Sequence, residues 1–100
     1  MSYETGALNA TLAAAAGDDL GLFAELRGAF VESVAAQIQQ LTYAQGDGDW
    51  QLAAVRLKGI AASFQAFPLI ALAEEAVEST AGDPSIIARL EAVLASLIVG

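Results

Sequence analysis

The sequence predicts an all-α protein, and more specifically an antiparallel up-and-down four-helix bundle with a short extra N-terminal helix. Its 100 residues suit one domain, so residues 1–100 are expected to form a single unit. Apolar residues make up 56% of the chain, which is enough for one packed core. They recur at helical spacing between glycine and proline breaks, and no segment alternates in the manner of a strand.

Glycine and proline residues divide the chain into one short and four longer segments. Gly17 is expected to close the first helix, and Asp18 to be the N-cap of the second. Pro68 and Pro84 both suit the first position of a helix, and Asp83 suits the cap before Pro84. The short connections favour antiparallel neighbours. In chain order, the expected helices run over about residues 5–16, 18–44, 49–66, 68–81 and 84–99.

Each expected helix carries an apolar stripe that should face the core. Arg27 falls inside the second stripe, either with its aliphatic stem snorkelling at the bundle edge, which is favoured, or in a buried ion pair. Tyr43 and Trp50 flank the next connection and are expected to pack against the core or its end. The stripes comprise Leu8 and Leu12; Leu20, Phe23, Phe30, Val31, Val34, Ile38 and Leu41; Trp50, Ala53, Ala54, Leu57, Ile60, Ala61 and Phe64; Leu69, Leu72, Ala73 and Ala76; and Ile86, Leu90, Val93 and Leu97.

The absence of histidine and cysteine removes the residues on which most enzyme mechanisms depend. Histidine is the commonest general base and metal ligand, and cysteine supplies thiolate nucleophiles, zinc ligands and disulfides. We therefore expect neither enzymatic activity nor a bound cofactor or metal ion.

Two acidic clusters have simple interpretations. The Asp47-Gly48-Asp49 turn superficially suggests a calcium loop, but Lys58 stands where an EF-hand needs its glutamate, so a turn with a helix cap is favoured. Glu74, Glu75 and Glu78 could do acid–base work or hold a metal, but no Glu-x-x-His pattern accompanies them. A solvent-exposed face is favoured there.

The charge and hydropathy patterns argue against nucleic acids and membranes as partners. Twelve acids and four bases give a net charge of −8, which repels phosphate backbones and anionic lipids. The longest charge-free apolar stretch, between Lys58 and Glu74, is shorter than the ~18–20 residues of a membrane span. The opening Met-Ser-Tyr-Glu lacks the positive region of a signal peptide, so a cytoplasmic location is expected.

The third expected helix carries a second apolar face opposite its core stripe. Gly59 lies within this face, although glycine inside a helix costs roughly 1 kcal/mol relative to alanine, so a partner that approaches the backbone would explain it. We therefore predict a docking face; the alternatives are a helix that is alanine-rich all round, or a face covered by the first helix or by a second copy in a homodimer. The predicted docking residues are Leu52, Val55, Arg56, Lys58, Gly59, Ala62, Ser63 and Ala66.

Residues 54–66, Ala-Val-Arg-Leu-Lys-Gly-Ile-Ala-Ala-Ser-Phe-Gln-Ala, resemble the signature of histidine-containing phosphotransfer (Hpt) domains. That family's pattern reads His-x-Leu-Lys-Gly, with a Gly-Ala pair further along and a Leu-Glu ending in the next helix. The resemblance covers roughly residues 18–99. The matching positions are Leu57, Lys58, Gly59 and Ala66, followed by Leu69, Ala73 and Glu78 and preceded by Phe30, Leu41 and the Gly48-Asp49-Trp50 turn.

Two positions depart from the Hpt pattern. Val55 stands where the family has its phosphoryl-accepting histidine, and Gln65 where it usually has glycine. Valine has no lone pair with which to accept a phosphoryl group. The resemblance thus implies the fold and docking roles for Lys58 and Gly59, while the sequence denies the transfer reaction. The altered Gln65 favours natural divergence over an engineered loss of the histidine.

The resemblance implies a module of bacterial two-component or phosphorelay signalling that cannot carry a phosphoryl group on histidine. Its expected partner is the receiver domain of a response regulator or a histidine kinase, bound by docking alone. The alternative is a structural or self-association helical bundle with no phosphorelay role.

Overall fold

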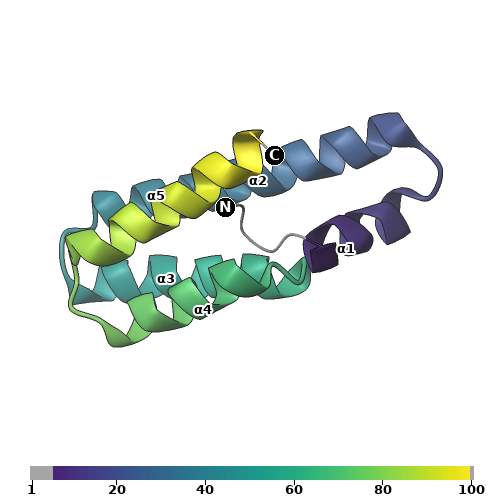
Figure 1. The fold of residues 1–100 in the computed structure, drawn as a ribbon. Coiled ribbons are helices and arrows are strands. Elements are labelled where there is room, and N and C mark those ends of the chain that lie inside the picture. Colours follow the sequence, from purple (N-terminus) through teal and green to yellow (C-terminus); the bar gives the residue numbers. More distant parts are fainter. Residues whose placement is uncertain (1–5, 100) are drawn as a thin grey trace.

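The structure is a computed structural model that describes residues 6–99, and these residues form five α-helices and no strand (Figure 1). The all-α prediction is therefore confirmed. The expected start of the first helix at Thr5 lies outside the described residues. In chain order the helices are α1 (Gly6–Ala16), α2 (Leu20–Thr42), α3 (Asp47–Ser63), α4 (Phe67–Glu78) and α5 (Pro84–Val99).

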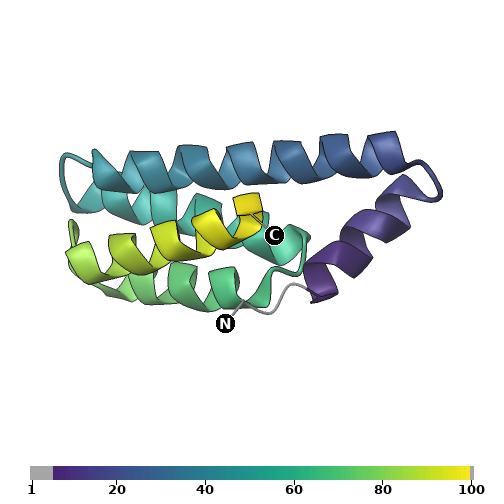
Figure 2. The same cartoon turned by 45° about the horizontal axis from the view of Figure 1, so that its top comes forward.

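The helices pack as a set of neighbouring pairs. α3 packs against both α2 and α4, and α5 packs against the same two helices. α2 is the longest helix, and α5 runs back along it in the opposite direction (Figure 2). α1 folds back from the turn at Gly17 and packs against α2, so that it lies near the end of the molecule where α3 joins α4 (Figures 1 and 2).

The predicted stripes form one continuous core. Those of α1, α4 and α5 are buried throughout, and those of α2 and α3 are buried or partly buried except at Leu20. The placement of Leu20 was wrong: its side chain is 84% exposed, because it is the first residue of α2 and lies at the turn from α1. A helical period identifies a face, but it does not show how far the neighbouring helices cover it.

The turn between α1 and α2 corrects one predicted cap. Gly17 has a φ of +65° and donates its N–H to the Ala13 carbonyl at 2.9 Å, as expected of a glycine that ends a helix. The N-cap of α2 is Asp19 and not Asp18, because the Asp19 carboxylate accepts the Leu22 N–H at 3.0 Å.

A Schellman motif ends α3 at Ser63, earlier than predicted. The Gln65 N–H donates to the Ala62 carbonyl at 3.2 Å, and the Ala66 N–H donates to the Ala61 carbonyl at 2.9 Å. Gln65 takes the left-handed conformation that this motif requires, with a φ of +55°. Ala66 is the next residue and packs into the core beside the buried Ala61. Ala66 therefore lies beyond α3, at the N-cap of α4.

Replacing Gln65 by glycine is expected to raise the free energy of unfolding by about 1 kcal/mol, because glycine adopts positive φ without a steric cost. Urea denaturation would measure the change. Gln65→Ala is the control and should give no comparable gain, since alanine is also strained at this φ. Equal stability of the glycine and alanine variants would contradict this account of the turn.

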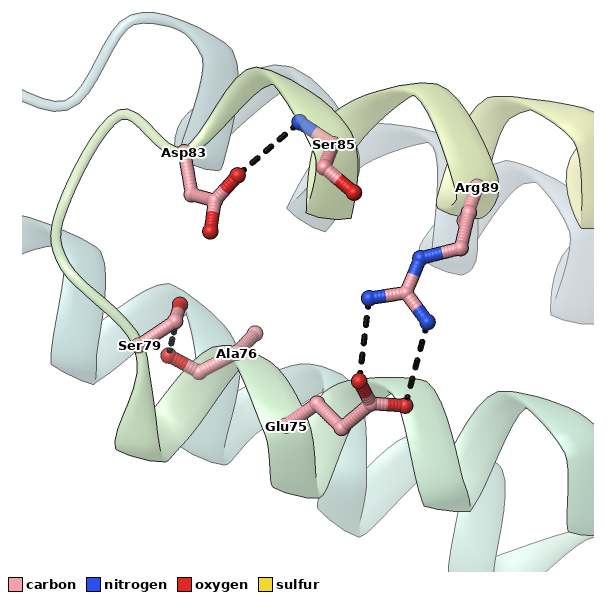
Figure 3. Close-up of polar contacts among 6 residues, drawn as sticks. All are labelled: Glu75, Ala76, Ser79, Asp83, Ser85 and Arg89. Atoms are coloured by element: carbon pink, nitrogen blue, oxygen red, sulfur yellow. Dashed lines mark hydrogen bonds and ion pairs between the residues drawn. The ribbon is translucent and has the colours of Figure 1, made fainter.

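The connection from α4 to α5 is held by side-chain contacts (Figure 3). The Asp83 carboxylate accepts the Ser85 N–H at 2.9 Å, which confirms the predicted cap. Arg89 of α5 donates through both terminal nitrogens to the Glu75 carboxylate of α4, at 2.9 and 3.3 Å.

At the other end of α4, Pro68 takes the second helical position and not the first, because the helix begins at Phe67. α4 ends at Glu78, three residues earlier than predicted.

Arg27 makes no ion pair with the described residues. Its guanidinium donates to the Leu97 carbonyl near the end of α5, and the side chain is partly buried. A cation near the last carbonyls of a helix is favourable because these oxygens have no partner within the helix. This geometry agrees with an aliphatic stem that snorkels at an edge and excludes the buried ion pair.

Among residues 6–99, none of the helices combines the length and the apolar character needed to cross a bilayer.

Candidate functional site

The candidate site is the exposed face of α3, and Trp50 anchors the helix that carries it. The indole of Trp50 is buried, and its Nε1–H donates to the Ala76 carbonyl of α4 at 2.7 Å. The Gln51 side chain donates to the next carbonyl of α4, that of Val77. These contacts set the rotation of α3 about its axis, and hence which residues it exposes. Tyr43, which was expected to pack against the core or its end, is mainly exposed instead.

Two acidic residues stabilise the beginning of the same helix. Asp47 and Asp49 lie in the first turn of α3, where a negative charge is favourable near the free N–H groups. The Asp49 carboxylate also accepts the Gln45 N–H at 3.2 Å. The predicted turn with a helix cap was wrong: Asp47, Gly48 and Asp49 form the first turn of α3 itself, and the N-cap is Gly46, where no side chain caps the helix.

One face of α3 presents apolar side chains to solvent. Leu52 is 51% exposed and Val55 is 53% exposed, although both are apolar. Gly59 and Ala62 continue this face toward the end of the helix and are also exposed. α1 leaves these four residues exposed and packs mainly on α2. The alternative that the first helix covers this face is therefore wrong.

Gly59 has open space around its missing side chain. A Cβ built on it would meet no atom of the described residues within 4 Å. Packing within residues 6–99 therefore gives no reason for a glycine here. Gly28 of α2 is equally open, which makes it a matched position for comparison.

Polar residues border the apolar face on both sides. The Lys58 ammonium lies 3.4 Å from the Glu74 carboxylate of α4, and both side chains are about half exposed. Such an exposed pair contributes little to stability and can open readily. Ser63 donates its hydroxyl to the Gly59 carbonyl at 2.9 Å. Arg56 is exposed and forms no ion pair within the described part of the chain.

The structure brings together seven of the eight predicted docking residues. The exposed residues are Leu52, Val55, Arg56, Lys58, Gly59, Ala62 and Ser63. The inclusion of Ala66 in the exposed face was wrong, because the Schellman motif turns the chain after α3 and directs Ala66 into the core. Sequence reasoning also missed the partner of Lys58, since Glu74 lies on another helix and no spacing along the chain marks the pair.

The face carries no histidine that could accept a phosphoryl group. Val55 is at its centre, and a valine side chain can neither donate nor accept a proton or a phosphoryl group. Nearby, the acidic residues are accessible and partly used in helix-to-helix contacts: Glu74 pairs with Lys58, and Glu75 with Arg89. Over residues 6–99 there is no group of three or more potential metal ligands. The arrangement suits binding by contact.

Comparison with protein-family models, with curated proteins and with solved structures finds no match to this chain. The Hpt resemblance therefore stays a prediction that rests on the motif in α3.

Proposed function

We propose that this chain is an Hpt-like docking module of two-component or phosphorelay signalling that binds a receiver domain or a sensor kinase without accepting a phosphoryl group. The exposed apolar face of α3, which includes the open Gly59, is the observation that carries the proposal. Contiguous exposed apolar area commonly marks an interaction site. Within the Leu-Lys-Gly order that resembles the Hpt motif, Lys58 and Gly59 are exposed on this side of α3, whereas Leu57 packs in the core.

We further propose that α2 to α5 constitute an antiparallel up-and-down four-helix bundle, with α1 as the extra helix. The pairwise packing supports this arrangement, because α3 and α5 each contact both α2 and α4. The short connections between successive helices also favour antiparallel neighbours. In such a bundle, one side of α3 is free to meet a partner.

In the proposed mechanism the module acts only by binding its partner, without transferring a phosphoryl group. Leu52 and Val55 supply apolar area, and Gly59 lets the partner approach the helix backbone closely. Arg56 can form an ion pair with a carboxylate of the partner. Lys58 can do the same by leaving its ion pair with Glu74, because that pair is exposed. A bound receiver domain or kinase would be withheld from its phosphorylated partners.

A binding experiment with a matched arginine control tests the proposal. We expect a receiver domain or sensor kinase from the same organism to bind with a dissociation constant in the range of about 1–100 µM, as for weak signalling contacts. Gly59→Arg should weaken binding by about tenfold or more, because arginine would hold the partner away from the backbone. Gly28→Arg makes the same change at an equally open glycine of α2 and should leave the affinity unchanged.

Calorimetry would supply the affinities, and circular dichroism would verify that both variants fold. Equal binding by the Gly59→Arg variant and the unchanged protein would show that the α3 face is not the docking surface. Failure of every receiver domain and kinase to bind, together with a concentration-dependent dimer in sedimentation, would favour a self-association module instead.

A further inference from the structure

A second surface with binding character lies between α2 and α5, away from the α3 face. It is an open groove whose walls are formed by one side of each helix. Its floor includes the buried Ile38, and its rims carry apolar residues and two carboxylates. The lining residues that matter here are Glu32 and Ala36 from α2, its C-cap residue Tyr43, and Glu91, Ala95 and Ile98 from α5.

The groove exposes large apolar side chains to solvent. Tyr43 is 69% exposed and Ile98 is 63% exposed. Tyr43 follows the C-terminal end of α2, and Ile98 lies near the C-terminal end of α5. Because α5 runs back along α2 (Figure 2), these two residues lie toward opposite ends of the groove. Between them, Ala36 and Ala95 have side chains too small to fill the space between the helices. The groove therefore has room for apolar side chains of a binding partner.

The charges at the groove are of one sign. Glu32 and Glu91 line it, and the lining includes no lysine or arginine. Neither carboxylate makes an ion pair with the described residues. Arg27 and Arg89 are not among the lining residues: Arg27 donates to the carbonyl of Leu97, the chain neighbour of Ile98, and Arg89 pairs with Glu75. The partner that best complements this surface has apolar residues flanked by cations.

We propose that the groove between α2 and α5 binds an amphipathic helix of another protein, whose apolar face is flanked by lysine or arginine. A helix suits a groove between two helices because its side chains can interdigitate with theirs. The groove follows α2 from Glu32 to Tyr43, which is roughly 16 Å at the helical rise and so accommodates about three turns. The chain's net charge of −8 would also speed the encounter with a cationic helix.

This proposal does not depend on the docking role of α3. The two surfaces share no residue, and α3 contributes nothing to the groove. The charges also differ, because Arg56 and Lys58 border the α3 face, whereas Glu32 and Glu91 border the groove. Either proposal can therefore fail while the other stands.

The test uses the full chain and a synthetic helical probe. The probe is a fluorescein-labelled peptide of about 14 residues, long enough for the groove, with a leucine and alanine face flanked by lysines. One comparison peptide replaces the lysines by glutamates, and another has the same composition in an order that is not amphipathic. Fluorescence anisotropy should show saturable binding of the lysine peptide, weakened by about tenfold or more for either comparison peptide.

Charge-reversal variants of the protein test whether the peptide binds in the groove. The double variant Glu32→Lys/Glu91→Lys should weaken binding of the lysine peptide by about tenfold or more. Glu25→Lys/Glu78→Lys makes the same change in net charge at exposed positions outside the groove and should weaken it by less than about threefold. Ala95→Gln, which fills the groove without a charge, should also weaken binding and serves if the charge variant does not fold.

Three outcomes would overturn the proposal. The first is no saturable binding of the lysine peptide. The second is an equal loss in the two charge-reversal variants, which would indicate a general attraction to the acidic surface. The third is a protein that dimerises by itself and loses the dimer in Ala95→Gln, which would make a second copy the occupant of the groove.

Discussion

Replacing Trp50 by alanine is expected to lower the free energy of unfolding by about 3–5 kcal/mol. Trp50 is among the largest fully buried side chains, and its removal leaves a cavity between α3 and α4. The change also removes the Nε1–H that donates to the Ala76 carbonyl. Since single domains are stable by only about 5–15 kcal/mol, much of the stability would be lost. Urea denaturation followed by circular dichroism would measure it.

Two control variants separate the parts of this effect. Trp50→Phe keeps most of the apolar volume and should cost less than the alanine variant, because the Ala76 carbonyl also accepts hydrogen bonds from Ser79. Tyr43→Ala removes an aromatic ring from the same connection, but this ring is mainly exposed, so the loss should be below about 0.5 kcal/mol. Similar losses in Trp50→Ala and Tyr43→Ala would contradict the anchoring role of Trp50.

If the chain has the proposed Hpt-like function, replacing Val55 by histidine is expected to create phosphoryl uptake on α3. Position 55 is exposed on α3, so an imidazole there can meet a phosphorylated aspartate of a receiver domain. Lys58 lies one turn away and can leave its exposed pair with Glu74 to serve the phosphoryl group. Incubation with a radiolabelled phosphorylated receiver that binds the chain would detect acid-labile phosphate on the variant.

A histidine placed elsewhere is the control for this gain. Leu20→His adds an imidazole at a highly exposed position of α2, far along the chain from the motif, and should take up no phosphate. The double change Val55→His/Gly59→Arg should bind the receiver weakly and lose the uptake. If Val55→His binds the receiver yet remains unphosphorylated, the α3 face does not retain phosphotransfer geometry, and only the docking proposal survives.

Much of the helical core could be read directly from the sequence. The stripes of α1, α4 and α5 were predicted and are buried, because helical spacing places residues three and four apart on one side. Asp83 and Gly17 marked helix ends for local reasons, since a carboxylate caps free N–H groups and glycine adopts positive φ. The absence of histidine and the position of Val55 were likewise visible without coordinates.

Other features depend on contacts between segments that are distant in the chain. Ala66 has an apolar side chain that suits either an exposed stripe or a core, and the left-handed turn at Gln65 decides in favour of the core. Lys58 meets Glu74 only because α3 packs against α4. The groove between α2 and α5 likewise needs both helices in place before its alanines and carboxylates face one another. Local patterns determine the helices, whereas their packing determines which side chains remain free to bind.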